Sequence, residues 1–69
     1  MKLNRNKVEK LLNEYCEGNY NRFARELDLD TSHIYRYLKT GIGGGRKLIG
    51  AVLEFTKSKG LNYEDFIEL

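Results

Sequence analysis

Apolar residues recur every three or four positions along nearly the whole of this sequence. Spacing of this kind gathers apolar side chains on one face of an α-helix. No convincing stretch alternates apolar and polar residues as a half-buried strand would, and there is no proline to interrupt a helix. The sequence therefore predicts an all-α fold.

Five helices account for this pattern. The fourth covers "RKLIGAVLEFTKSKG", has the broadest apolar face and is expected to be the most buried. The fifth covers "YEDFIEL", and Asp65 stands three residues after Asn62 in the manner of a capping box. Residues that favour helix starts and glycines that favour helix ends mark the other boundaries. The expected starts are Asn4, Asn19, Asp30 and Asn62, and the expected ends are Gly18 and Gly60.

The size of the chain limits what it can do. Its 69 residues make one domain, residues 1–69, with a small core and little room for a deep substrate pocket. No apolar run is long enough to cross a membrane, and the first residues lack the apolar region of a signal peptide. Cys16 is the single cysteine, so no internal disulfide can form and a cytoplasmic location is expected.

The net charge of +2 is too small to identify a partner, but its distribution says more. Arg46 and Lys47 lie in a basic middle region, whereas Glu64, Asp65 and Glu68 make the end of the chain acidic. This arrangement suits a face that binds a polyanion while the acidic tail is turned away. A mixed, solvated surface explains the same charges equally well.

The segment "NYNRFARELDLDTSHIYRYL" is read as two helices joined by a short turn. Ala24 is small enough to allow the two helices to cross at close range. Leu29 can insert the turn into the core. Ile34 can anchor the third helix and so fix which of its faces points outward.

This segment resembles the helix-turn-helix of the phage lambda-repressor and Cro-like family. That family has an apolar–alanine pair in its second helix, here Phe23-Ala24, with further apolar residues three, five and ten positions after the alanine, here Leu27, Leu29 and Ile34. The resemblance implies a five-helix, lambda-repressor-like DNA-binding domain whose second and third helices form the helix-turn-helix. It also implies a small phage- or prophage-type transcriptional regulator, without enzymatic activity, that binds a double-stranded DNA operator.

Two positions depart from the family pattern. The family usually has glycine where this chain has Asp28, a position that often needs a left-handed backbone; aspartate tolerates that conformation better than most residues. The family also commonly ends its third helix with a glycine six residues after the position of Ile34. Here Gly41 comes after seven, so the loop beyond it is expected to differ locally.

Helical geometry separates the two faces of the third helix, about residues 30–39. At about 100° per residue, Ile34, Tyr37 and Leu38 point inward, whereas the opposite side faces solvent. In a recognition helix, the N-terminal residues and one residue a turn later reach base edges in the major groove. Arg36 is the residue best suited to bidentate contact with guanine. The predicted base contacts are Thr31, Ser32, Tyr35 and Arg36.

The stretch "KTGIGGGRKLIG" is not a nucleotide-binding P-loop, because Lys47 is followed by Leu48 and no strand precedes it. Its glycines would let the main chain approach a DNA phosphate; a flexible connector is the alternative. In the resembling family, the start of the second helix also abuts a phosphate, as helix N-termini favour anions. The predicted phosphate contacts are Asn19, Tyr20, Lys39, Gly44, Gly45, Arg46 and Lys47.

Other classes of function find little support. No nucleophile–base pair, acid pair or metal-ligand set is apparent, and His33 has no Cys, His or carboxylate at ligand spacing. No enzyme activity, cofactor, metal, small-molecule substrate or membrane association is expected. The rival hypothesis is a protein-interaction module of the same fold, antirepressor-like, that does not bind DNA. A weak homodimer is also predicted through Leu61, Phe66, Ile67 and Leu69, unless these four cover the fourth helix.

Overall fold

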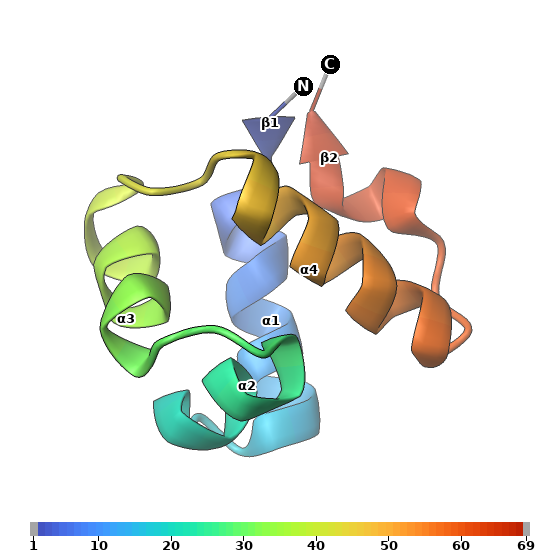
Figure 1. Ribbon diagram of the computed structural model, residues 1–69. Coiled ribbons are helices and arrows are strands. Elements are labelled where there is room, and N and C mark those ends of the chain that lie inside the picture. Colours follow the sequence, from blue (N-terminus) through green and yellow to red (C-terminus); the bar gives the residue numbers. More distant parts are fainter. Residues whose placement is uncertain (1, 69) are drawn as a thin grey trace.

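The computed structural model describes residues 2–68 and is mainly helical, as the periodicity predicts. Figure 1 shows α3 and α4 on opposite sides, α2 below them and α1 behind. Within residues 2–68, no helix has both the length and the apolarity needed to cross a lipid bilayer. The helices are α1 (Arg5–Cys16), α2 (Tyr20–Leu27), α3 (Thr31–Thr40) and α4 (Arg46–Ser58).

The predicted N-caps explain where the helices begin. The Oδ1 atom of Asn4 accepts the N–H of Lys7 at 3.2 Å, and Oδ1 of Asn19 accepts the N–H of Arg22 at 3.0 Å. Each bond satisfies a donor that the first turn of a helix leaves without a partner. Asp30 holds the N-cap position of α3, but its side chain makes no capping hydrogen bond.

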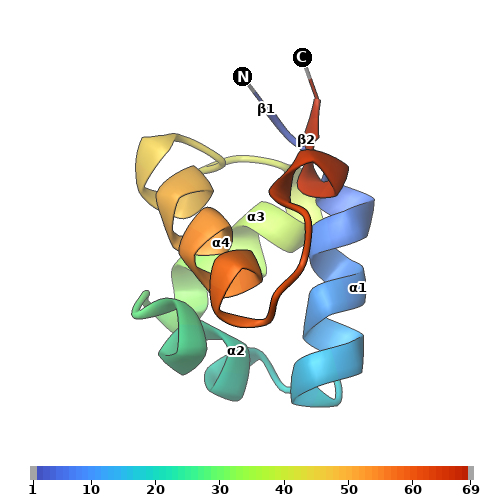
Figure 2. The same cartoon turned by 90° about the vertical axis from the view of Figure 1, so that its right-hand side faces the viewer.

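The end of the chain differs from the prediction of a fifth α-helix. It forms a 3-10 helix (Tyr63–Phe66) followed by β2 (Ile67–Glu68), which pairs in antiparallel fashion with β1 (Lys2–Leu3). The N–H of Asn4 donates to the carbonyl of Phe66 at 2.8 Å, so the C-terminal segment bonds to the segment before α1 as well as within its own 3-10 turn. Figure 2 shows β1 and β2 side by side. Strands of two residues are too short to leave an alternating pattern in the sequence.

The core joins all four helices. The ring of Phe23 is fully buried and meets that of Phe55 edge to face, with the centroids 5.8 Å apart. The broad apolar face predicted for α4 does turn toward the core: Leu48, Val52 and Phe55 are buried, and Ile49 and Leu53 are partly buried. The buried apolar residues are Leu3, Val8, Leu11, Leu12, Cys16, Phe23, Ala24, Leu27, Ile34, Tyr37, Leu38, Leu48, Val52, Phe55 and Phe66.

The apolar residues of the C-terminal segment bear on the predicted homodimer. Phe66 is buried in the core, and Leu61 and Ile67 pack against it half-buried. Leu69 lies outside the described residues. These three described residues therefore cover the core and do not form the exposed patch that motivated the dimer contact. Dimerisation stays a prediction, and Leu61, Phe66 and Ile67 offer no exposed apolar surface for the contact.

The buried thiol of Cys16 and the buried phenol of Tyr37 should make the protein less stable at alkaline pH. Burial raises the pKa of the Cys16 thiol above its ordinary 9.0 and that of the Tyr37 phenol above its ordinary 10.0. The unfolded chain therefore releases these protons at lower pH than the folded chain does. The free energy of unfolding should fall as the pH rises above about 9, by at most about 1.4 kcal/mol per pH unit for each group.

Urea unfolding followed from neutral to alkaline pH measures this effect. Tyr37→Phe should remove the part of the fall that begins near the ordinary phenol pKa of 10.0 and should leave the earlier part, due to Cys16, in place. A free energy of unfolding that stays constant across this range would contradict the prediction.

Candidate nucleic-acid interface

Helix α3 has one buried and one exposed side. Ile34, Tyr37 and Leu38 are buried, which confirms the predicted inward face. Ser32 and Arg36, one turn apart, are exposed on the other side. The core thus fixes the rotation of α3 about its axis and presents a defined row of side chains to solvent.

The turn between α2 and α3 sets the angle between them. Asp28 has φ 57°, which confirms the left-handed backbone predicted at this position. Its N–H donates to the carbonyl of Arg25 at 3.1 Å, and the N–H of Leu29 donates to that of Ala24 at 2.9 Å. Leu29 also packs half-buried against the core. Backbone hydrogen bonds and an apolar anchor therefore hold this turn.

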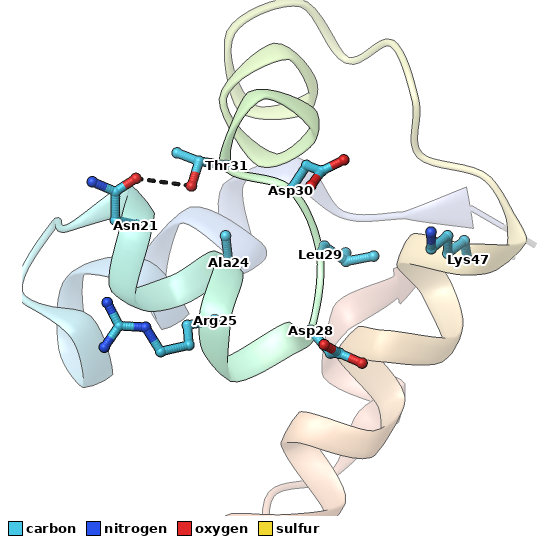
Figure 3. Close-up of a pocket in the computed structure, with 8 residues that line it drawn as sticks. All are labelled: Asn21, Ala24, Arg25, Asp28, Leu29, Asp30, Thr31 and Lys47. Atoms are coloured by element: carbon cyan, nitrogen blue, oxygen red, sulfur yellow. Dashed lines mark hydrogen bonds between the residues drawn. The ribbon is translucent and has the colours of Figure 1, made fainter.

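A side-chain hydrogen bond ties the start of α3 to α2. Oγ1 of Thr31 donates to Oδ1 of Asn21 at 2.8 Å (Figure 3). The bond uses the hydroxyl proton of Thr31, so this side chain keeps its lone pairs and its methyl group for other contacts. The amide nitrogen of Asn21 points away from Thr31 (Figure 3). The sequence did not point to Asn21 as a site residue, because its bond to Thr31 forms only when α2 and α3 pack together.

An aromatic pair connects the start of α2 to the exposed side of α3. The rings of Tyr20 and Tyr35 meet edge to face with their centroids 5.4 Å apart. The ammonium of Lys39 lies 5.6 Å from the centroid of the Tyr35 ring. Tyr35 is 51% exposed although both neighbours contact its ring. The structure thus brings together Tyr20, Tyr35 and Lys39, all three predicted to touch DNA.

The glycine-rich segment between α3 and α4 packs on α3. Nε2 of His33 lies 2.8 Å from the carbonyl oxygen of Gly43; because a carbonyl can only accept, this nitrogen carries the proton. Gly43 has φ 93°, a conformation that favours glycine. A Cβ on Gly44 would lie 2.7 Å from Cε1 of Tyr37. These contacts disfavour the alternative of a flexible connector and turn Gly44 toward the core.

The start of α4 is more open. Gly45 is its N-cap residue, and a Cβ there would meet no atom within 4 Å. Arg46 and Lys47 are both exposed. Lys47 borders a groove that Asp28 and Asp30 also line, and Figure 3 shows it across from the α2–α3 turn. The two cations therefore differ, because Lys47 shares a groove with two carboxylates.

Comparison of the chain with family models, curated proteins and solved structures finds no significant match. In the described part of the chain, no group of three or more His, Cys, Asp or Glu side chains could hold a metal ion. Function must be argued from the geometry alone.

The predicted site residues fall into two sets. The first is exposed on α3 or at the start of α4, although Tyr35 and Lys39 of this set also contact neighbouring side chains. It comprises Ser32, Tyr35, Arg36, Lys39, Gly45, Arg46 and Lys47. The second already makes contacts within the protein that limit what else it can bind: Asn19, Tyr20, Thr31 and Gly44.

Proposed function

We propose that this chain is a sequence-specific double-stranded DNA-binding protein, a small transcriptional regulator of the lambda-repressor and Cro-like type. In this proposal α2, the turn at Asp28 and α3 form a helix-turn-helix, and α3 is the recognition helix. One observation carries the proposal: the core fixes α3 so that Ser32 and Arg36 stand exposed one turn apart, in the half of α3 that follows the Asn21–Thr31 bond.

The chemistry of the row suits direct base readout. The planar guanidinium of Arg36 can donate to O6 and N7 of one guanine in the major groove. Ser32 can donate to or accept from several bases, and Tyr35 and the methyl group of Thr31 offer apolar contact to thymine. Because the Asn21–Thr31 bond and the Tyr20–Tyr35 pair restrict these groups before binding, less conformational entropy is lost in the complex.

Phosphate contacts would fix the register of the complex. The N–H groups at the start of α4 have no side-chain cap, and at the start of α2 Asn19 caps only that of Arg22; helix N-termini favour anions. Lys39, Arg46 and Lys47 add positive charge along the same proposed interface. Such contacts add affinity and orientation without reading sequence.

The double substitution Arg46→Ala, Lys47→Ala should weaken binding to specific and non-specific duplexes alike. The slope of log K against log salt concentration should shrink by about 0.9 for each phosphate contact that is lost. Fluorescence anisotropy with labelled duplex at several salt concentrations measures the slope.

A matched control removes two exposed lysines elsewhere, Lys10 on α1 and Lys57 near the end of α4, with the same change in net charge. An equal change of slope in this control would assign the effect to overall charge rather than to contacts at the start of α4.

Selection from a random duplex library tests the function itself, since it asks both whether the chain binds DNA and which site it prefers. The selected duplex should then be retarded in a gel, and it should be palindromic if two chains bind together. Enrichment of no sequence, together with no retarded complex, would reject the proposal.

A protein-interaction module of the same fold is the second candidate. Two large apolar side chains support it: Ile42 is 63% exposed and Tyr35 is 51% exposed, and they lie on α3 or directly after it. Exposed apolar side chains favour protein contacts where they form a patch. The gel-shift experiment separates the two functions, because only the DNA-binding reading requires a retarded duplex.

A further inference from the structure

A groove separate from the exposed row of α3 lies where both ends of the chain meet the end of that helix. Segments far apart in sequence line it: the start of α1, the end of α3, the glycine-rich segment and β2. It has a volume of about 480 Å³. The polar side chains of the groove that bear on ligand binding belong to Lys2, Arg5, Asn6, Tyr37 and Glu68.

The hydroxyl of Tyr37 is an unusual feature of this groove. Its residue is only 4% exposed, and the hydroxyl has no hydrogen-bond partner within residues 2–68. Arg5 and Glu68 line the groove together with Tyr37. Burial raises the pKa of the Tyr37 hydroxyl; the positive charge of Arg5 opposes the rise and the negative charge of Glu68 adds to it. A buried donor without a partner is unfavourable, so an acceptor that reached it would stabilise the folded protein.

The start of α1 faces the same groove with its own donors. The first turn contains no acidic residue that would offset the positive end of the helix dipole. Oδ1 of Asn4 accepts the N–H of Lys7, which leaves the N–H groups of Arg5 and Asn6 as the other donors of this turn. These N–H groups adjoin the side chains that line the groove.

The charges of the groove leave an excess of one cation. Lys2 and Glu68 face each other in the register of β1 and β2 and contribute one charge of each sign to the groove. Arg5 has no such partner in the pairing, and its Nη1 would lie 3.1 Å from a Cβ on Gly41. The guanidinium therefore lies over the end of α3, beside the wall of the groove.

We propose that this groove binds a phosphate group, held by the guanidinium of Arg5, the N–H groups of Arg5 and Asn6 and the hydroxyl of Tyr37. A phosphate offers several acceptor oxygens, which suits donors that converge from a helix start, a side-chain fork and a hydroxyl. A free phosphate or a small phosphorylated molecule would bind whether or not the proposed function holds. A backbone phosphate of DNA would bind only if it does.

Titration of the ¹⁵N-labelled protein with inorganic phosphate, in the absence of DNA and at constant ionic strength, tests the site. Saturable shifts of the Arg5 and Asn6 amide signals are expected. Arg5→Gln and Tyr37→Phe should each weaken binding about tenfold, because each removes a hydrogen bond to a charged group. Lys10→Gln, with the charge change of Arg5→Gln but outside the groove, should leave the affinity unchanged.

Tyr37→Phe also has a readout that does not depend on phosphate. Because the hydroxyl has no partner within the described residues, its removal leaves no other group unpaired, and the Tm without phosphate should be unchanged or higher. A marked fall in Tm would mean that the hydroxyl already has a partner, and would count against the site.

A parallel titration with duplex DNA identifies the source of the phosphate. Shifts of the Arg5 and Asn6 amides with inorganic phosphate support a free phosphate as the ligand. Shifts with duplex alone, lost in Arg5→Gln, support a backbone phosphate. Shifts with neither, or shifts that Lys10→Gln reduces as much as Arg5→Gln does, overturn the proposal. Since the first titration contains no DNA, failure there leaves the proposed DNA binding untouched.

Discussion

Arg36→Ala should weaken binding to the selected operator by about 5- to 150-fold, or about 1–3 kcal/mol, and should relax the base preference at a single base pair. The guanidinium is exposed on α3 and is the one group of the row with the shape to contact two acceptors of a guanine at once. Gel shifts with the operator and with its three variants at the affected base pair measure both effects.

The stability of this variant should be close to that of the parent protein. Thr40 donates its hydroxyl to the backbone carbonyl of Arg36, which alanine retains. An exposed helical position also tolerates alanine well. Lys10→Ala gives the same change in net charge on α1 and should alter affinity far less. An Arg36→Ala protein with full affinity and unchanged base preference would remove Arg36 from the proposed readout.

The four α-helices and the faces of α3 could be predicted from the sequence because their causes are local. Ile34, Tyr37 and Leu38 share a face by helical geometry alone, and Asn4 and Asn19 cap helices through bonds that span three residues. These features depend on short sequence separations and on residue types with strong positional preferences.

The features that were missed depend on contacts across the fold. Phe66 accepts the N–H of Asn4 from the opposite end of the chain, and this bond helps direct the tail into a strand rather than an α-helix. Asn21 reaches Thr31 only because the turn at Asp28 brings α2 and α3 together. No local pattern of residues predicts such distant pairs, and a single sequence offers no other signal that two residues are in contact.

The glycines illustrate the same distinction within one short segment. Their clustering suggests a common purpose, such as close approach to a phosphate. Instead, Gly43 adopts a left-handed backbone and accepts a bond from His33, Gly44 makes room for the ring of Tyr37, and Gly45 begins α4 in open space. Of the two glycines predicted to contact phosphate, only Gly45 has open space beside its Cα.

Gly44→Ala should therefore destabilise the protein by about 1–3 kcal/mol, a typical cost of forcing an extra methyl group into a packed site. The new Cβ would lie 2.7 Å from Cε1 and 3.2 Å from Cδ1 of Tyr37, and this ring is buried and cannot swing away. Gly45→Ala is the matched control. Gly45 has φ −84° and no atom within 4 Å of the new Cβ, so no clash opposes the substitution. Its stability should change little, because the lower entropy of the unfolded chain offsets the weaker preference of alanine for the N-cap position.

Urea unfolding of the two variants measures the difference, and DNA binding below the unfolding transition then separates the two roles suggested for Gly44. If Gly44 serves only to seat the loop on Tyr37, the folded Gly44→Ala protein should bind duplex with a shifted but still salt-dependent affinity. Its slope of log K against log salt should match that of the parent, because no phosphate contact is lost. A reduced slope in this variant would restore Gly44 as a phosphate contact, and equal stability of the two variants would show that Gly44 does not pack against Tyr37 as described.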